Sequence, residues 1–434
     1  MTSTASAAGH AALAVPSSAP RVVARPARDL RLDVARGVCL LIIFVSHVPD
    51  NGWAHWIPAR WGFSDATEIF VFCSGMASAI VFGGTYARAG WALGTARVAY
   101  RVWQVYWAHV GLFLSVFVLL ALVDAAAWNP ERHYVGSLNL WKVLEEPARA
   151  LSGIVTLRWV PNYFDILPMY LVILAMIPAA VALARVSPIL VIAISFLVWV
   201  MAQRSVMGWL GLGAWQLRLP AEPWSDRTWF LNPFGWQLIF FTGFALVRGW
   251  LPRPPVTHAL LWSAVAVLLA SLALSSVGFR LWELGPVKAA YVAATGCVET
   301  GFGACNPVFD WRDGHQLWWD KTDLSILHYV HFLALAYVAW ALAGPDGINL
   351  TRSGDGPMER ARDAAVEVAS VVGRQSLAVF VFSMGLSQVA GVVLDLTGRG
   401  AVTVAAVNLG GLAAILLCAL VVGWVRSQPW RAAR

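Results

Sequence analysis

Arg36 and His47 stand eleven positions apart, and the residues between them are apolar or small. If this segment is a helix, eleven residues make about three turns, so both side chains lie on one face, about 16 Å apart along the axis. A guanidinium and an imidazole are costly inside a bilayer and often mark a functional site. An imidazole suits a general base near neutral pH, and an arginine fork suits phosphate or carboxylate. The competing interpretation is an interfacial arginine and a structural histidine.

Two carboxylates, Asp65 and Glu68, are three residues apart and share a face if a helix begins there. One of them can orient and charge His47, as the acid does in a nucleophile–base–acid array. The same two residues fit a capping box, with Asp65 as the N-cap and Glu68 at the third helical position. The two interpretations are compatible, because the cap would lie near the outer end of the first apolar segment.

Three further arginines, Arg97, Arg101 and Arg374, fall near the same expected membrane surface as Arg36. Together they are candidates to bind a phosphate-bearing donor. For Arg97 and Arg101, snorkelling at the interface is the competing explanation.

On the opposite side, Trp236, Asp320 and Lys321 are candidate substrate-binding residues. Asp320 and Lys321 can hydrogen-bond a sugar, or they can cap the helix that follows. His328 and His331 have a spacing of three but lack a third ligand, so we predict no metal site.

The composition indicates an all-α polytopic integral membrane protein. Of the 434 residues, 59% are hydrophobic and 13% are charged, whereas soluble domains carry about 25% charged residues. A bundle of about ten transmembrane helices is expected. The segments are 34–52, 65–86, 99–123, 163–184, 186–203, 232–250, 258–278, 324–343, 374–396 and 401–425.

Arginines in the short connections place both termini in the cytoplasm of a multi-pass inner-membrane protein. The Trp-rich connections 124–162, 204–231 and 279–323 then face the other side, where Cys297 and Cys305 can form a disulfide. Residues 1–27 are expected to be a disordered cytoplasmic tail, 28–426 the membrane domain and 427–434 a second cytoplasmic tail. The net charge of +7 suits cytoplasmic loops and lipid headgroups, and no motif for binding nucleic acid is present.

The Arg36/His47 spacing and the stretch Ser64-Asp65-Ala66-Thr67-Glu68 resemble the acyltransferase-3 superfamily, and within it the OpgC-type proteins. The other matching stretches are 32–37, 232–237, 320–324 and 373–380. The resemblance implies transfer of succinyl from cytoplasmic acyl-CoA to osmoregulated periplasmic glucans, with Arg36 and His47 essential and no permanently bound cofactor. Arg97 and Arg101 only approximate the closely spaced arginine pair of the wider superfamily.

Two other functions compete with an acyltransferase. One is a proton-coupled transporter in which His47, Asp65 and Glu68 form a relay. The other is a glycan-binding membrane scaffold in which the Trp-rich loops hold sugar and His47 is structural. The acyl group, the glucan linkage, an acyl-His intermediate and the oligomeric state stay open at this stage.

Overall fold

The computed structural model describes residues 29–298, 300–301, 303–351, 354 and 356–432. Within these ranges the chain is helical, and its single isolated β-bridge joins Pro220 to Thr228. The expected all-α class is confirmed. The expected tail over residues 1–27 lies outside the described residues, and the final segment contains a short helix, α19 (Pro429–Ala432).

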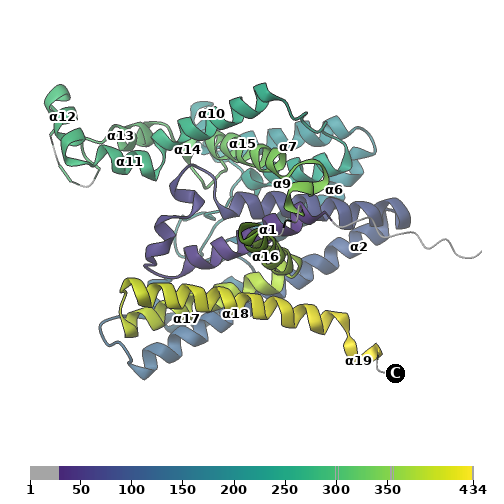
Figure 1. Ribbon diagram of the computed structural model, residues 1–434, viewed down its shortest axis with the longest axis horizontal. Helices are drawn as coiled ribbons and strands as arrows, with labels where there is room; N and C mark the ends of the chain where they lie inside the picture. The colour runs from purple at the N-terminus through teal and green to yellow at the C-terminus, as the bar shows by residue number, and fades with distance from the viewer. Residues whose placement is uncertain (1–28, 299, 302, 352–353, 355, 433–434) are drawn as a thin grey trace, which may run out of the picture.

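Long helices make up most of the molecule (Figure 1). They are α1 (Leu30–His47), α2 (Ala66–Ala126), α6 (Ile166–Ala184), α7 (Pro188–Ala202), α9 (Pro233–Arg248), α10 (His258–Leu274), α15 (Ile326–Ala343), α16 (Pro357–Arg374), α17 (Ser376–Thr397) and α18 (Ala401–Ser427). Short helices connect them: α3 (Tyr134–Ser137), α4 (Lys142–Glu145), α5 (Pro147–Val155), α8 (Arg204–Trp209), α11 (Ser276–Trp282), α12 (Gly285–Thr295), α13 (Pro307–Gly314) and α14 (Gln316–Trp319). The 3-10 turns are η1 (Gly52–His55), η2 (Pro58–Arg60), η3 (Gly213–Trp215) and η4 (Pro345–Leu350).

The number of membrane spans differs from the ten expected. Five helices in the described part of the chain are long and apolar enough to cross a membrane, or six if the bent pair α10 and α11 is one span. The structure therefore supports a helical membrane protein but not ten such helices. The apolar α7 has only 15 residues, α9 has 16, and α1 carries Arg31, Asp33 and Arg36.

Two of the expected segments, 65–86 and 99–123, fall within the 61 residues of α2. This helix is not straight, because Gly90 has a left-handed φ of 78°, which favours glycine. Arg97 donates to Thr85 Oγ1 at 2.5 Å and to the Val81 carbonyl at 3.4 Å. A straight helix would separate residues sixteen apart by about 24 Å, so α2 doubles back at Gly90.

Helix α1 lies at the centre of the bundle and packs against α2, α16 and α17 (Figure 1). Its crossing with α16 is unusually close. A Cβ built on Gly37 would lie 1.8 Å from the Ala369 carbonyl oxygen, and one on Gly373 would lie 1.9 Å from the Asp33 carbonyl oxygen. Only glycine allows the two backbones to touch at these points, so this crossing fixes the position of α1.

Helix α16 corrects another expectation, because residues 344–373 lie between the expected segments 324–343 and 374–396 and are predicted to be a connection without a helix. The charged residues between Glu359 and Glu367 lower the hydrophobicity of this stretch, so it was not recognised as a helix. It buries only Ala369, Ser370, Val372 and Gly373, near its end. Its partner there is α1.

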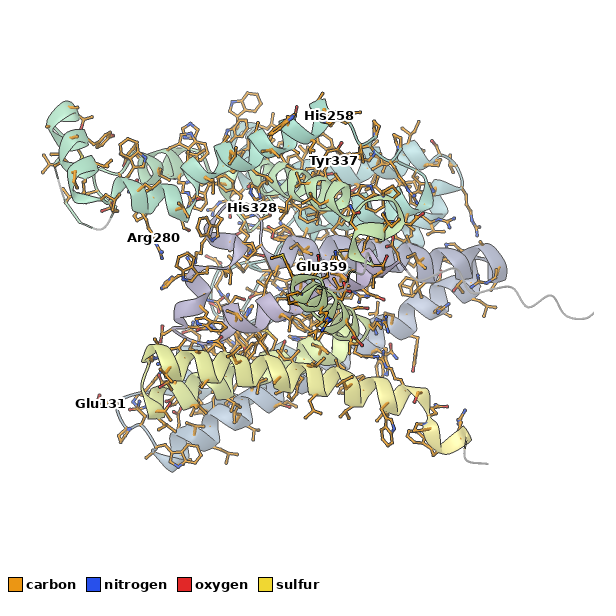
Figure 2. The ribbon with its side chains drawn as sticks, viewed as in Figure 1. Glu131, His258, Arg280, His328, Tyr337 and Glu359 are labelled. Carbon is orange, nitrogen blue, oxygen red and sulfur yellow. A yellow bond between two sulfur atoms is a disulfide. The ribbon has the colours of Figure 1, made fainter. Side chains whose placement is uncertain are left out.

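The connection from α10 to α15 forms an arm of short helices that projects from one side of the bundle (Figure 1). Arg280 lies on this arm (Figure 2) and donates to His55 Nδ1 at 3.1 Å. The disulfide left open by the sequence is present between Cys297 and Cys305. It links the two ends of the connection between α12 and α13.

Candidate active site

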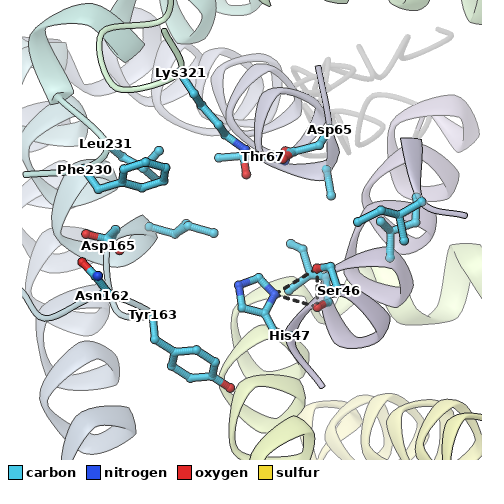
Figure 3. A pocket seen from close by; sticks show the side chains of 15 residues that line it. Ser46, His47, Asp65, Thr67, Asn162, Tyr163, Asp165, Phe230, Leu231 and Lys321 are labelled. Atoms are coloured by element: carbon cyan, nitrogen blue, oxygen red, sulfur yellow. Dashed lines mark hydrogen bonds and ion pairs between the residues drawn. The ribbon is translucent and has the colours of Figure 1, made fainter. Parts of the chain in front are cut away.

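One cavity of about 410 Å³ lies where the ends of several elements meet. His47 ends α1, Asp65 precedes α2, Asp165 precedes α6, and Lys321 lies in the loop before α15. The polar residues lining the cavity are Ser46, His47, Asp65, Thr67, Asn162, Tyr163, Asp165 and Lys321 (Figure 3). Apolar side chains complete the lining, so distant parts of the sequence supply one small chamber of mixed polar and apolar character.

The imidazole of His47 is held in one tautomer. Its Nδ1 lies 2.8 Å from the Ile43 carbonyl oxygen and 3.0 Å from Ser46 Oγ. A carbonyl oxygen only accepts, so Nδ1 carries the proton and donates it. Nε2 makes no hydrogen bond to any described residue, and in the neutral ring it keeps its lone pair. The Tyr163 ring packs edge-on against the imidazole, with centroids 5.4 Å apart.

Tyr163 is itself fixed in place. Its φ of 89° lies in the left-handed region, which is strained for a residue other than glycine. Its hydroxyl bonds to the Met384 carbonyl and, at 2.7 Å, to Ser387 Oγ, both on α17. Strain of this kind persists where surrounding contacts enforce it, often at functional sites.

Asp65 and Glu68 form the capping box that the sequence predicts. The Thr67 amide donates to Asp65 Oδ1 at 2.6 Å, and the Asp65 amide donates to Glu68 Oε2 at 2.8 Å. Glu68 Oε1 lies 2.8 Å from Nδ1 of the buried His328. Neither carboxylate hydrogen-bonds His47, whose Nδ1 is held by the backbone instead. Asp65 lines the cavity, so a through-space effect on His47 stays a prediction.

Lys321 forms an ion pair with Asp65. Burial by itself raises the pKa of Asp65, but the Lys321 ammonium and hydrogen bonds outweigh burial and hold that pKa well below its usual value. Burial lowers the pKa of Lys321, whereas the carboxylates of Asp65 and Glu68 raise it, and the net pKa is raised. Both groups are therefore charged, and the cavity contains the Lys321 ammonium, held in place by the Asp65 carboxylate.

Trp236 and Asp320 do not line the cavity. Trp236 is fully buried, and its Nε1 lies 3.2 Å from the carbonyl oxygens of Lys321 and Thr322. Asp320 Oδ1 accepts from the Thr322 amide at 2.8 Å. The structure thus places these two candidate substrate-binding residues behind the Lys321 loop, where they fix its shape.

His331 on α15 pairs with Ser64. Ser64 Oγ lies 2.6 Å from His331 Nδ1, and the Ser64 amide lies 3.3 Å from the same atom. Among the described residues, no cluster of three His, Cys, Asp or Glu side chains suits a metal ion.

Of the four arginines predicted to bind the donor, two lie at one helix crossing and two lie elsewhere, on α2. Nε of Arg36 is buried and has no partner among the described residues. Arg374 Nε lies 3.6 Å from Asp33 on α1, so Arg36 and Arg374 both belong to the α1/α16 crossing. Arg97 and Arg101 are tied to neighbours on α2 by hydrogen bonds, and neither contacts Arg36.

Sequence reasoning missed Asn162, Tyr163 and Asp165. Asp165 is 8% exposed, and its Oδ1 has no hydrogen-bond partner in the described chain. It occupies the N-cap position of α6, yet its side chain makes no capping bond. The available signal was an Asp and an Asn that directly precede a strongly apolar segment in an otherwise apolar stretch.

A comparison with families of known proteins settles the relationship. A family model described as OpgC protein matches residues 28–427. The chain belongs to the OpgC family. No curated protein and no solved structure matches it. OpgC membership indicates a transferase-type enzyme, which agrees with an imidazole lining a cavity that also holds a carboxylate and an ammonium.

Proposed function

We propose that this chain is a membrane O-acyltransferase that moves an acyl group, most simply succinyl, from cytoplasmic acyl-CoA to a hydroxyl of a periplasmic glucan. The observation that carries this proposal is the tautomer of His47. Its Nδ1 is tied to the Ile43 carbonyl, and Nε2 is left as the acceptor at a cavity of about 410 Å³. OpgC membership supports transferase chemistry.

His47 acts as a general base in this scheme. The acceptor hydroxyl oxygen attacks the thioester carbonyl carbon while its proton passes to Nε2. The C–S bond then breaks, and the departing CoA thiolate takes up the proton that the imidazolium releases. The Ile43 carbonyl holds the ring throughout and stabilises its cationic form.

The Lys321 ammonium supplies fixed positive charge to the cavity. It is placed to stabilise the negative charge that develops on the thioester oxygen, or to bind the free carboxylate of a succinyl group. Asp65 holds this ammonium in position. We assign Asp65 and Glu68 to this support rather than to direct contact with His47.

Arg36 is the proposed contact for the anionic part of the donor. A buried guanidinium nitrogen without a partner is costly, and a phosphate oxygen would satisfy it. Arg36 lies about 16 Å of helix rise from His47. A donor held at Arg36 therefore has to extend its arm along the bundle to reach the cavity. Arg374, beside Asp33 on the same crossing, is the second proposed contact.

The proposed topology has both termini in the cytoplasm of the inner membrane. Helix α2 doubles back at Gly90, and we propose that each half crosses the membrane. The shorter or more polar helices α1, α7 and α9 would then cross as well, with α10 and α11 as one bent span, which gives ten passes. Every segment that lines the cavity then lies at the periplasmic ends of these passes.

Replacing His47 tests the proposed function. His47→Ala is expected to reduce succinyl transfer from succinyl-CoA to periplasmic glucan by at least about a hundredfold, because loss of a general base commonly costs 10²–10⁴. The measurement is mass spectrometry of glucans from cells that express each variant. His258→Ala replaces an exposed histidine on α10 (Figure 2) and is expected to keep wild-type succinylation.

Normal succinylation by His47→Ala would show that His47 is not the base. Proton-driven flux in vesicles without consumption of acyl-CoA would instead favour a transporter. Gel filtration and thermal melting of the purified variants show whether a loss of activity follows from misfolding.

A further inference from the structure

The wall of the cavity opposite His47 combines an amide, a carboxyl group and an aromatic ring. Figure 3 shows Asn162, Asp165 and Phe230 on one side of the cavity, with His47 and Ser46 on the other. Asn162 and Asp165 precede α6, and Phe230 precedes α9. The reaction proposed above assigns none of the three a role.

Asp165 needs a hydrogen-bond donor. A buried carboxyl oxygen without a partner is rare in folded proteins and costs stability. The oxygen concerned, Oδ1, has no partner among the described residues, although the side chain lines a chamber large enough for a ligand. Burial raises the pKa of Asp165 to about 7, in spite of Arg227, which lowers it. A hydroxyl group of a ligand would provide the missing partner.

Asn162 presents the complementary group. Its Oδ1 accepts from Arg227 Nη1 at 2.7 Å, so the oxygen end of the amide is turned towards the arginine. Arg227 is held by Glu222 at 3.2 Å and by the Val160 carbonyl at 2.9 Å. The NH₂ group of Asn162 therefore has donors available to a ligand, beside the acceptor offered by Asp165.

Phe230 adds an apolar surface to this wall. Its side chain is 46% exposed while lining the cavity. Ligand pockets are lined mainly by hydrophobic and aromatic side chains, and an aromatic ring at such a wall offers a flat apolar face to a ligand. A pyranose ring has one face of C–H groups that suits an aromatic ring, and hydroxyls at its edge that suit planar acceptors and donors.

We propose that Phe230, Asp165 and Asn162 form a subsite for one pyranose ring of a carbohydrate acceptor. Phe230 packs on the face of the ring, Asp165 accepts from one hydroxyl, and Asn162 donates to a neighbouring one. A further hydroxyl of the same sugar is thereby directed across the cavity to His47. The volume of about 410 Å³ lies within the range of small-ligand sites, roughly 300–1,000 Å³. The subsite rests on the proposed function in so far as this sugar is the acyl acceptor.

Direct binding tests the subsite without any transfer reaction. The probe is periplasmic glucan purified from cells that lack this protein, titrated into the detergent-purified full chain by calorimetry. Asp165→Asn and Phe230→Ala are each expected to weaken glucan binding at least about tenfold, the loss of roughly 1.4 kcal/mol. Asp226→Asn, the matched change at an exposed aspartate four positions before Phe230 in the chain, is expected to bind glucan as the wild type does.

Kinetics separate this inference from the proposed function. In Asp165→Asn, KM for glucan should rise while KM for succinyl-CoA stays unchanged, a split that a general loss of folding would not produce. The subsite is overturned if Asp165→Asn and Phe230→Ala bind glucan within twofold of the affinity of Asp226→Asn. It is also overturned if the wild-type protein does not bind glucan. If binding follows expectation but His47→Ala still transfers succinyl, the assignment of His47 fails and the subsite stands.

Discussion

Asp165 shows how a binding site and stability conflict at a single residue. Its carboxyl is buried without a partner for Oδ1 in the described chain, an arrangement that folding alone would not favour. Natural proteins depart from the rules of stable packing mainly at functional sites. The same side chain is therefore expected to weaken the fold and to strengthen ligand binding.

The stability of the protein should depend on pH through Asp165. Its pKa is raised to about 7 from an ordinary value of 3.8, so between these values the folded chain keeps a proton that the unfolded chain loses. The free energy of unfolding therefore falls as pH rises from about 4 to about 7. The Asp165→Asn variant should not show this fall. Above pH 7 its free energy of unfolding should exceed that of the wild type by up to about 4 kcal/mol.

Thermal melting at about pH 5 and about pH 8 measures this effect. Asp165→Asn should lose less of its melting temperature between the two pH values than the wild type and Asp226→Asn do. An equal loss in all three proteins would show that Asp165 is not the group that titrates.

At the residue scale, sequence reasoning singled out His47, Asp65 and Lys321, which line the cavity, because charge beside apolar segments is conspicuous. It missed Asp165 and Asn162, which lie at the edge of a segment, where polar residues are ordinary. It also expected Trp236 to face substrate. The first turn of α9 instead directs this indole to the carbonyls of the Lys321 loop, a contact between residues far apart in sequence that no local pattern reveals.

Among the elements, the α1/α16 crossing decides where the site residues stand. Gly37 and Gly373 bring the two backbones into contact, and the same crossing holds Arg36 and Arg374. The apolar segments were predictable as helices because hydrophobic runs are a strong signal. The amphipathic α16 and the reversal of α2 at Gly90 were not, since each depends on packing against a partner helix.

Gly37→Ala should disturb the site from a distance. The new Cβ would lie 1.8 Å from the Ala369 carbonyl oxygen, so α1 and α16 must separate. We expect a lower melting temperature, equivalent to a loss of about 1–3 kcal/mol in the free energy of unfolding. We also expect a clear loss of succinyl transfer, because Arg36 and His47 both lie on α1. Gly385→Ala on α17 is the matched control, since its Cβ meets nothing within 4 Å. Equal stability of the two variants would contradict a tight crossing.

For the molecule as a whole, the cavity joins segments that the charge pattern places on one side of the membrane. The end of α1, the starts of α2 and α6, and the connections before α9 and α15 all meet there. The positive-inside rule uses only the connections and contains no information on contacts. The structure brings together the ends that this rule assigns to the periplasm, which is the arrangement that the proposed acceptor site requires.

The disulfide allows the orientation to be tested on the unmodified chain. Cys297 and Cys305 are bonded in the arm between α10 and α15, and disulfides persist in the oxidising periplasm. In spheroplasts, a membrane-impermeant reductant followed by an impermeant maleimide should label these two residues. In inside-out vesicles the same treatment should leave them unlabelled, and mass spectrometry of peptides separates them from Cys39, Cys73 and Cys418, which are free. The reverse pattern would place the arm, and with it the His47 cavity, on the cytoplasmic side, where a periplasmic glucan could not reach the base.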